Sequence, residues 1–217
     1  MNKIVLFALT GLLLLASCTK ERVTGSGAII TENRNAASFT RVSTSGSTKV
    51  YITQGNAFKV QVKGYENLVA YMETKVNNNT LEIGFKTLVS VKNDNVEVFV
   101  TMPLIEGIST SGSSNVDVKG SFTSVNGLTT SLSGSGNIDI EQGTASFFKT
   151  TISGSGNIRA FGLAAQAADV FISGSGTTEV SAANNLKVNI SGSGMVYYKG
   201  QPIVETSISG SGKLVHR

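Results

Sequence analysis

Residues 132–140 read Leu-Ser-Gly-Ser-Gly-Asn-Ile-Asp-Ile, and the Ser-Gly-Ser-Gly phrase within them is written five times between residues 133 and 212. Successive copies start 20, 20, 18 and 18 residues apart. A flexible linker rich in Gly and Ser keeps no such period, whereas a structural repeat does. We therefore interpret the second half of the chain as a repeat, whose copies start at Ser133, Ser153, Ser173, Ser191 and Ser209.

The residues on either side of each phrase alternate between apolar and polar. An aliphatic residue stands immediately before every copy, and in most copies apolar residues stand two and four positions after it. This pattern predicts a half-buried strand on each side of a bend. A unit of about 20 residues cannot bury its own apolar face, so the units are expected to stack into a solenoid. The predicted interior column is Leu132, Ile152, Ile172, Ile190 and Ile208.

The phrase itself is expected to form the corner of each coil. Glycine reaches backbone angles that other residues avoid, and it leaves no side chain to collide with the next coil. A nest of backbone amides that binds a ligand is the functional alternative. We favour packing at a corner, because the corner alone explains why the phrase recurs.

Weaker copies precede the five clear ones. Ser111-Gly-Ser-Ser114 starts 22 residues before Ser133. Ser45-Gly-Ser-Thr48 starts 66 residues before Ser111, which equals three spacings of 22. Thr24-Gly-Ser-Gly27 resembles a degenerate copy. These spacings predict that the repeat spans the mature chain. They also predict that its middle third has been overwritten, meaning that the repeat there is replaced by sequence without the phrase.

The overwritten part, from Ala37 to Gly107, is expected to contain longer strands with period-two alternation. Turns are predicted at residues 77–79 and 92–95, which are rich in Asn, and a short helix within residues 65–74. These strands are expected to form broader coils or a small sheet that is continuous with the solenoid.

The first 18 residues have the pattern of a targeting segment. Lys3 is followed by an apolar run from Ile4 to Leu15, which is shorter than a membrane span, and the segment ends Leu-Ala-Ser-Cys at Cys18. This end resembles the lipobox of bacterial lipoproteins, in which the cysteine is acylated and becomes the first residue of the mature protein. The resemblance implies that Cys18 is lipidated and that the membrane is a partner through this anchor. An ordinary secretory signal with an incidental cysteine is the alternative.

We therefore divide the chain into a lipoprotein signal peptide (1–18), a tether and first strand (19–36) and a β-solenoid head domain (37–217). The formal net charge of the whole chain is +4. This charge is too small and too scattered for the electrostatic footprint of a nucleic-acid-binding protein, so no nucleic-acid partner is expected.

Several motifs of the head domain occur in a characteristic order. They are the strand from Phe39 to Val42, the Ser45 phrase with the strand from Val50 to Gly55, then Leu81 to Ile83, then Val98 to Leu104 leading to Ile108 through Ser113. In this order the chain resembles the family of the "putative auto-transporter adhesin, head GIN domain" from Ala37 to Leu214. The resemblance implies an all-β, right-handed parallel β-helix-like solenoid with coils of about 18–22 residues, and an exported or lipid-anchored protein of a Gram-negative envelope. It supplies no catalytic residues.

The sequence offers little for catalysis. His216 is the only histidine and Cys18 the only cysteine, so neither a zinc site nor a Ser-His-Asp or Cys-His arrangement is expected. The glycine phrases do not complete a nucleotide-binding fingerprint, because Asp139 or Arg159 falls on the third glycine position. We expect no catalytic residue, no metal and no cofactor.

Four residues are candidates for surface contact. If the repeat register holds, Asp139 and Arg159 lie on neighbouring coils about 5 Å apart, together with Asp117 and Glu179 in equivalent positions. Ordinary surface charge pairing is the simplest interpretation of these residues. Tyr197 and Tyr198 are adjacent, so they point to opposite sides of a strand, and one of them is expected to be exposed.

The favoured function is that of a non-enzymatic, lipid-anchored protein of the bacterial cell envelope, an adhesin or structural interaction module at the outer membrane, on its periplasmic or its surface face. Its partner is an unknown envelope or extracellular protein or glycan. The alternative is a glycan-binding or glycan-active β-helix. The last copy lacks a capping helix, so we also expect its coil to be covered by self-association, as a homo-oligomer, or by a partner.

Overall fold

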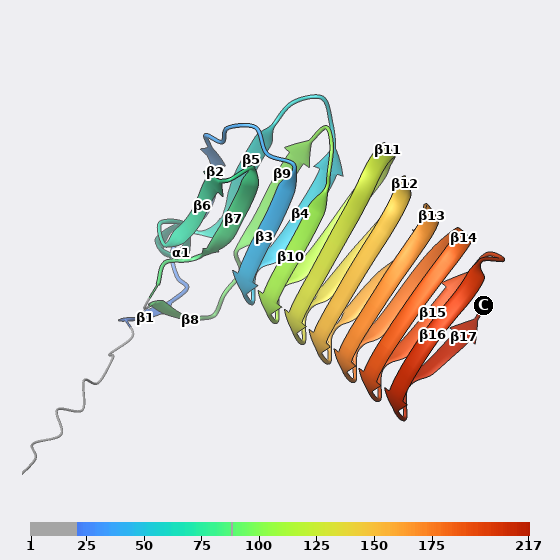
Figure 1. Ribbon diagram of the computed structural model, residues 1–217. Helices are drawn as coiled ribbons and strands as arrows, with labels where there is room; N and C mark the ends of the chain where they lie inside the picture. The colour runs from blue at the N-terminus through green and yellow to red at the C-terminus, as the bar shows by residue number, and fades with distance from the viewer. Residues whose placement is uncertain (1–20, 88) are drawn as a thin grey trace, which may run out of the picture.

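A computed structural model describes residues 21–87 and 89–217 of the chain. Strands make up 74% of the structure and helix 2%, and they form a β-solenoid of about 5 turns, so the predicted fold class is confirmed. Figure 1 shows a rod of stacked coils with the N-terminal strands at one end and the C-terminus at the other. The expected signal peptide and Cys18 lie outside the described residues.

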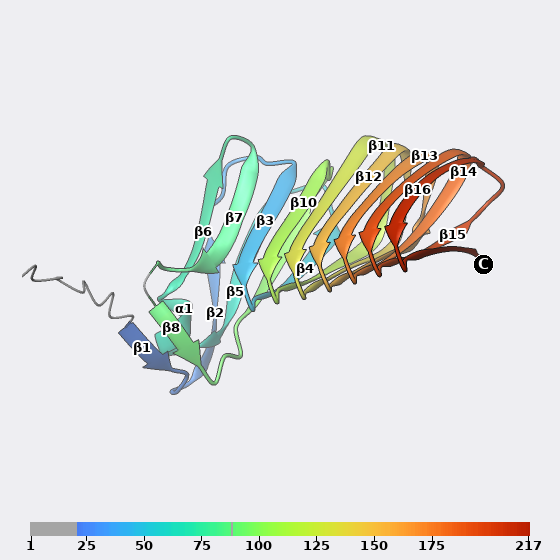
Figure 2. The same cartoon turned by 60° about the horizontal axis from the view of Figure 1, so that its bottom comes forward.

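The coils stack through parallel strands. Each strand pairs with the equivalent strand of the next coil, and the Ser-Gly corners lie one above the other (Figures 1 and 2). The strands of the stack are β10 (Gly107–Gly112), β11 (Asn115–Gly134), β12 (Asn137–Gly154), β13 (Asn157–Gly174), β14 (Thr177–Gly192), β15 (Met195–Lys199), β16 (Ile203–Gly210) and β17 (Lys213–His216).

The interior column predicted from the sequence is present. Leu132 pairs with Ile152, and the column continues through Ile172 and Ile190 to Ile208. The first four are at most 2% exposed, whereas Ile208 is 40% exposed because no further coil covers it. Stacking therefore buries side chains that a single coil leaves in water.

Glycines allow the corners to stack closely. Gly154 has φ +129°, and a Cβ placed on it would collide with the carbonyl oxygen of Gly134 in the preceding coil. The second glycine of the same phrase, Gly156, lies against the carbonyl oxygen of Gly136 and the side chain of Leu132. Both glycines of the phrase are thus needed, one for its backbone conformation and its lack of a Cβ, the other for close approach alone.

The N-terminal half contradicts the predicted overwritten coils. The strand β3 (Arg41–Gly46) pairs directly with β10, so that Ser45 lies beside Ser111. The copies at these two positions are therefore consecutive coils, although 66 residues separate them, and the spacing of three periods is coincidental. The intervening residues leave the stack after β4 (Lys49–Gln54) and return to it at β10.

The inserted residues extend both sides of the first coil into a two-layer cap (Figure 2). One layer continues from β3 through β7 to β6, and the other from β4 through β9 and β5 to β2. Antiparallel pairs replace parallel ones at β6–β7, β5–β9 and β2–β5. The elements of the cap are β2 (Ile29–Arg34), β5 (Lys59–Tyr65), α1 (Glu66–Val69), β6 (Met72–Asn77), β7 (Thr80–Phe85) and β9 (Glu97–Met102).

The cap bears out the expectation of a small sheet continuous with the solenoid, together with the predicted short helix, α1. The turn at residues 77–79 is also present, with Asn78 and Asn79 at positive φ. The expectation of longer strands in this half is wrong: β5 has 7 residues, whereas β12 continues for 18. The reason is that a solenoid strand keeps its ladder through the bends of its coil, whereas hairpin turns interrupt the strands of the cap.

The degenerate copy at Thr24 is not a coil. Thr24 ends β1 (Glu21–Thr24), which pairs with β8 (Val89–Lys92) in a separate two-stranded sheet. The next strand, β2, pairs antiparallel with β5, so no corner forms between two stacked strands. The repeat therefore begins at β3, and the prediction that it spans the whole mature chain is wrong. Within residues 21–87 and 89–217, no helix has the length and apolar character needed to cross a membrane.

Candidate functional site

One outward-facing column of side chains runs along the rod on the strand segments that come directly after the Ser-Gly corners. Each coil contributes one outward residue, and neighbours are about 4.8 Å apart because parallel strands stack in register. We call this column the charged stripe. Its residues are Tyr51, Asp117, Asp139, Arg159, Glu179 and Tyr197, in spatial order.

An ion pair occupies the centre of the charged stripe. The Arg159 guanidinium lies 2.8 Å from an Asp139 carboxylate oxygen, and Glu179 flanks it on the next coil. The hydrogen bond to Asp139 raises the pKa of Arg159, which keeps the guanidinium charged. The register thus brings together the two charged candidates identified from the sequence.

Asp117 lies beside Asp139 on the preceding coil. Burial raises the pKa of Asp117, the nearby Asp139 raises it further, and Lys119 acts in the opposite direction. A shallow groove of about 470 Å³ passes over these carboxylates and Arg159, and Phe161 and Glu179 also line it. The groove can therefore accept a ligand that offers both hydrogen-bond donors to the acids and an acceptor or anion to the arginine.

Aromatic rings stand at both ends of the charged stripe. The Tyr51 ring stacks on Phe99 with centroids 5.1 Å apart. At the other end, the Arg217 guanidinium carbon lies 4.5 Å from the centroid of the Tyr197 ring. Such rings offer flat apolar faces next to charges.

The two candidate tyrosines point to opposite sides, as their adjacency predicts. Tyr197 belongs to the charged stripe, whereas Tyr198 packs against the core and against the ring of His216, 4.8 Å away. Both tyrosines are half-buried. Only Tyr197 therefore faces the groove side of the rod.

A ladder of asparagines borders the charged stripe. Asn137 donates from Nδ2 to Oδ1 of Asn115 at 2.7 Å, and Asn157 donates in the same way to Asn137 at 2.9 Å. These amides satisfy one another along the stack. They tie the coils of β11, β12 and β13 together in register.

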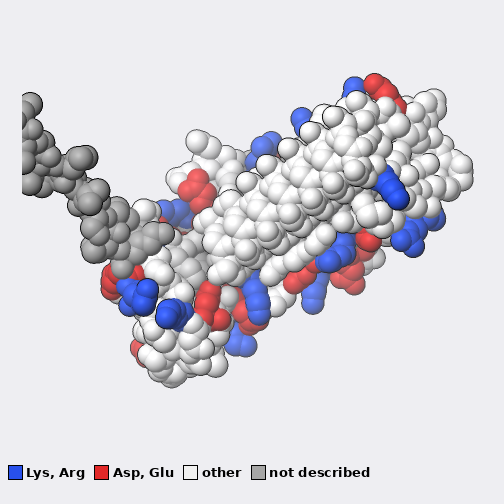
Figure 3. All heavy atoms as spheres, turned by 90° about the horizontal axis from the view of Figure 1, so that it is seen from below, with Lys and Arg blue, Asp and Glu red and all other residues white. Residues whose placement is uncertain are grey.

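The corner side of the rod has a different chemistry. Serines from successive coils form one exposed column, and Figure 3 shows a band without acidic or basic side chains along this side, with charges at its margins. The column consists of Ser45, Ser111, Ser133, Ser153, Ser173, Ser191 and Ser209.

Sequence reasoning missed one aromatic on this side. Phe171 stands between Thr151 and Asn189 in an outward column that is otherwise polar, and it lines a shallow groove of about 390 Å³. The Nζ of Lys149 lies 5.6 Å from the centroid of its ring. The signal was present in the sequence, because Phe171 occupies the repeat position that holds a polar residue in its neighbours.

The titratable side chains of the described residues form no cluster suited to a metal ion. His216 has a structural role, since its Nε2 lies 2.9 Å from the Gly200 carbonyl oxygen and its ring packs on Tyr198. It therefore helps to hold the last coil against the one before it.

Stacked coils that present like side chains in columns define the class of this protein: a β-solenoid head domain with extended outer surfaces. The chain belongs to the family described as "Putative auto-transporter adhesin, head GIN domain", which it matches over residues 38–202. The family resemblance inferred from the order of the motifs is thereby confirmed.

Several solved structures have the same architecture. A putative adhesin from Bacteroides fragilis NCTC 9343 is 23% identical, with a TM-score of 0.72 over 90% of this chain and 100% of that one. A putative adhesin from Parabacteroides distasonis ATCC 8503 is 25% identical, with a TM-score of 0.57 over 91% and 100%. A putative lipid binding protein from the same strain is 24% identical, with a TM-score of 0.57 over 91% and 100%. No curated protein matches the chain.

Proposed function

We propose that this protein is a non-enzymatic, lipid-anchored adhesin of the bacterial cell envelope that contacts its partner through the outer faces of the solenoid. The observation that carries the proposal is the in-register stacking of outward side chains, which turns single residues into columns along the rod. The family and the solved neighbours, which are described as putative adhesins, support a location at the cell surface or in the envelope.

The chemistry of the charged stripe favours binding over catalysis. Asp139 is already engaged by Arg159 at 2.8 Å, and both side chains are well exposed to solvent. A general acid or base works best in a site that excludes water, which this open groove does not do. An open groove with a paired carboxylate suits reversible contacts with a partner surface instead.

Glycan binding is the second candidate function, and Phe171 favours it. Its ring stands among Thr151, Ser173 and Asn189 along a groove on the corner side. An aromatic face surrounded by hydroxyl and amide groups matches the alternating apolar and hydroxyl faces of a sugar ring. A glycan array with Phe171→Ala as the comparison tests this candidate, since a true glycan site loses its signal in the variant.

The lipid anchor is proposed from the sequence around Cys18 and is tested separately. Cells that express the protein are labelled with a radioactive fatty acid, and the wild-type protein is expected to carry the label. Cys18→Ser is expected to lose both the label and the membrane fraction. Protease treatment of intact cells then decides between the periplasmic and the surface face.

The adhesion proposal is tested by neutralising the ion pair of the charged stripe. The double variant Asp139→Asn with Arg159→Gln replaces both charges by neutral amides and is expected to lower adhesion of cells or coated beads about tenfold, which corresponds to roughly 1.4 kcal/mol. A matched control neutralises the exposed pair Glu73 and Lys75, 3.0 Å apart in the cap. Equal adhesion by wild type and both double variants contradicts a role for the stripe.

A further inference from the structure

The groove beside Phe171 is longer along the rod than along any strand. Two outward positions from each of four consecutive coils line it, on β12, β13, β14 and β16. Because coils stack about 4.8 Å apart and alternate residues of a strand lie about 7 Å apart, the groove extends for about 14 Å along the rod and about 7 Å along a strand. We call it the corner groove. Its shape suits a ligand that is elongated along the rod.

The two rows of outward side chains that line the corner groove are uncharged. One row is formed by Ser153, Ser173, Ser191 and Ser209, and the other by Thr151, Phe171, Asn189 and Ser207. The hydroxyl and amide groups of these rows both donate and accept hydrogen bonds. A charged ligand group that entered between the rows would lose water without meeting an opposite charge, which costs free energy. The rows therefore favour a neutral ligand that is rich in hydroxyl groups.

A charged column borders the corner groove and alternates in sign. It lies two residues before the column of Phe171 on each strand and consists of Lys149, Asp169, Lys187 and Glu205. Lys187 is paired with Glu205 at 3.4 Å. A polyanion that lay along the rod would meet a carboxylate on every second coil, and a polycation would meet an ammonium group. Because like charges held side by side are unfavourable, the column disfavours polymers of either sign.

Phe171 supplies the apolar part of the corner groove. Its ring is half-buried and stands between Thr151 and Asn189 of the neighbouring coils. A ring face of this kind packs against the apolar face of a sugar ring. Asn189 and the Nζ of Lys149, which lies 5.6 Å from the ring centroid, stand beside it and offer hydrogen bonds to the hydroxyls of such a sugar.

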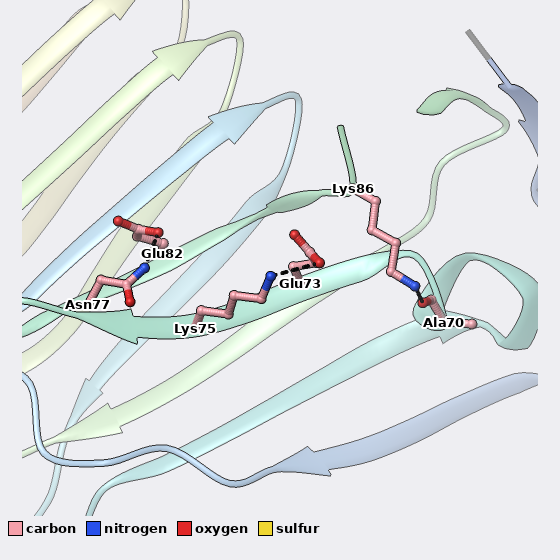
Figure 4. A network of polar contacts seen from close by, with 6 residues as sticks. All are labelled: Ala70, Glu73, Lys75, Asn77, Glu82 and Lys86. Atoms are coloured by element: carbon pink, nitrogen blue, oxygen red, sulfur yellow. Dashed lines mark hydrogen bonds and ion pairs between the residues drawn. The ribbon is translucent and has the colours of Figure 1, made fainter. Parts of the chain in front are cut away.

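The uncharged face ends at the cap. The same sheet continues from β3 into β7 and β6, where the outward side chains are charged. Glu73 pairs with Lys75 there, and Asn77 donates to Glu82 (Figure 4). From β3 to β16, by contrast, the two outward columns next to the corner contain only Ser, Thr, Asn and Phe. The surface suited to a neutral ligand therefore belongs to the stack and not to the cap.

We propose that the corner groove binds a neutral polysaccharide whose chain lies along the rod, with one sugar ring packed on Phe171. This inference rests on the glycan-binding candidate of the proposed function, and it adds the charge and the direction of the ligand. Successive sugars meet similar pairs of polar side chains on successive coils, because the columns repeat. Affinity is therefore expected to rise with chain length until the groove is filled.

A glycan array tests the charge of the ligand. The array carries neutral glucose and mannose oligomers of increasing length, and galacturonic acid oligomers of the same lengths as their charged counterparts. The full chain with Cys18→Ser, which cannot be acylated, is expected to bind the neutral oligomers with an affinity that rises over the first few sugars and then levels off. It is expected to bind the acidic oligomers about tenfold more weakly. Equal binding of both kinds, or stronger binding of the acidic ones, overturns the proposal.

A double variant tests how the charged column selects the ligand. Asp169→Asn with Glu205→Gln leaves Lys149 and Lys187 as the charges of this column on the four coils. This variant is expected to gain binding of the galacturonic acid oligomers about tenfold and to keep its affinity for the neutral oligomers. An unchanged preference overturns selection by charge.

Two variants of one serine column test the direction of the ligand. Ser209 lines the corner groove two coils beyond Phe171, whereas Ser111 stands in the same column on β10, outside the groove. Both serines are exposed, so a lysine fits at either position without disturbing the core. Ser209→Lys is expected to lower the affinity for long neutral oligomers about tenfold and to leave that for the shortest ones unchanged. Ser111→Lys is expected to bind all of them like the wild type.

The outcomes separate this inference from the function on which it rests. If no glycan binds, or if Phe171→Ala binds like the wild type, the glycan-binding candidate fails and this inference fails with it. If Phe171→Ala loses binding while Ser209→Lys and Ser111→Lys behave alike, only the direction proposed here is overturned. Lower bead adhesion by Ser209→Lys without any glycan signal indicates a protein partner on this face and also overturns the proposal.

Discussion

The stack and the cap solve the same packing problem in different ways. In the stack, equivalent residues such as Ile152 and Ile172 pair across coils, so one favourable contact is repeated along the rod. In the cap, antiparallel pairs such as Glu73 with Gly84 join unlike residues, and each contact occurs once. In the repeat, the residues on which stability depends are therefore concentrated at a few phrase positions. In the cap, stability depends on many individual side chains.

The largest expected effect concerns the corner glycine, compared between an inner coil and the first coil, which adjoins the cap. Gly154→Ala places a Cβ against the carbonyl oxygen of Gly134 at φ +129° and is expected to destabilise by about 4 kcal/mol or to prevent folding. Gly46 holds the same phrase position in the first coil, where a Cβ meets nothing within 4 Å at φ +84°. Gly46→Ala is therefore expected to cost only about 1–2 kcal/mol.

Urea denaturation of both glycine variants measures this difference. Similar losses of unfolding free energy in Gly46→Ala and Gly154→Ala contradict the view that stacking, rather than backbone conformation alone, fixes the phrase. A loss of unfolding free energy confined to Gly154→Ala supports the view that contact with the preceding coil fixes the phrase.

A smaller difference is expected within one interior column. Ile152 is fully buried, so Ile152→Ala is expected to cost about 2–5 kcal/mol. Ile208 stands at the end of the same column, 40% exposed, and Ile208→Ala is expected to cost under about 1 kcal/mol in the monomer. Thermal unfolding at low protein concentration measures both. Equal costs run against the conclusion that burial arises from stacking.

The smallest expected effect concerns Asp117, which lies on β11 beside Tyr51 of the first coil. Burial raises its folded pKa above the ordinary value of 3.8, so the folded state holds the proton more tightly than the unfolded state. This contribution favours folding at acid pH and is lost as pH rises from the ordinary pKa through the raised one. Asp117→Asn is therefore expected to gain stability relative to wild type as the pH rises from below the ordinary pKa of 3.8 toward neutral. Melting temperatures across this range measure the gain, and a constant difference argues against a raised pKa.

In the cap, Asp94 provides a second case for the same measurement. Burial raises its pKa, while the backbone N–H of Val96, 2.8 Å away, acts in the opposite direction. Asp94→Asn is expected to show the same sign of pH dependence as Asp117→Asn, because both folded pKa values are raised. Opposite signs indicate that the backbone hydrogen bond dominates at Asp94.

Periodicity made the stack predictable. The column through Ile172 and the pairing of Asp139 with Arg159 both followed from the spacing, because in-register stacking converts sequence position into spatial position. The same logic failed for Ser45 and Ser111, since an insertion whose length is a multiple of the period mimics missing copies. Spacing alone does not distinguish a diverged coil from an excursion that leaves the stack and returns.

The candidate surfaces were only partly predictable. The register identified the centre of the charged stripe, but the stacking of Tyr51 on Phe99 depends on the inserted strand β9 lying beside β4, which no local pattern specifies. Phe171 has no adjacent aromatic residue, and it stands out only against the polar residues of its own repeat column. A departure from the column consensus is the more informative signal in a repeat protein.

The strand β3 pairs with β10 on one edge and with β7 of the cap on the other, so the first coil stands between the cap and the later coils. New coils can therefore be added or removed beyond β10 without any change to the cap, each altering the reach of the head by about 4.8 Å. Gene duplication of a single unit is then enough to tune the span between the two tips of the molecule, so length becomes a property that evolution adjusts in fixed increments.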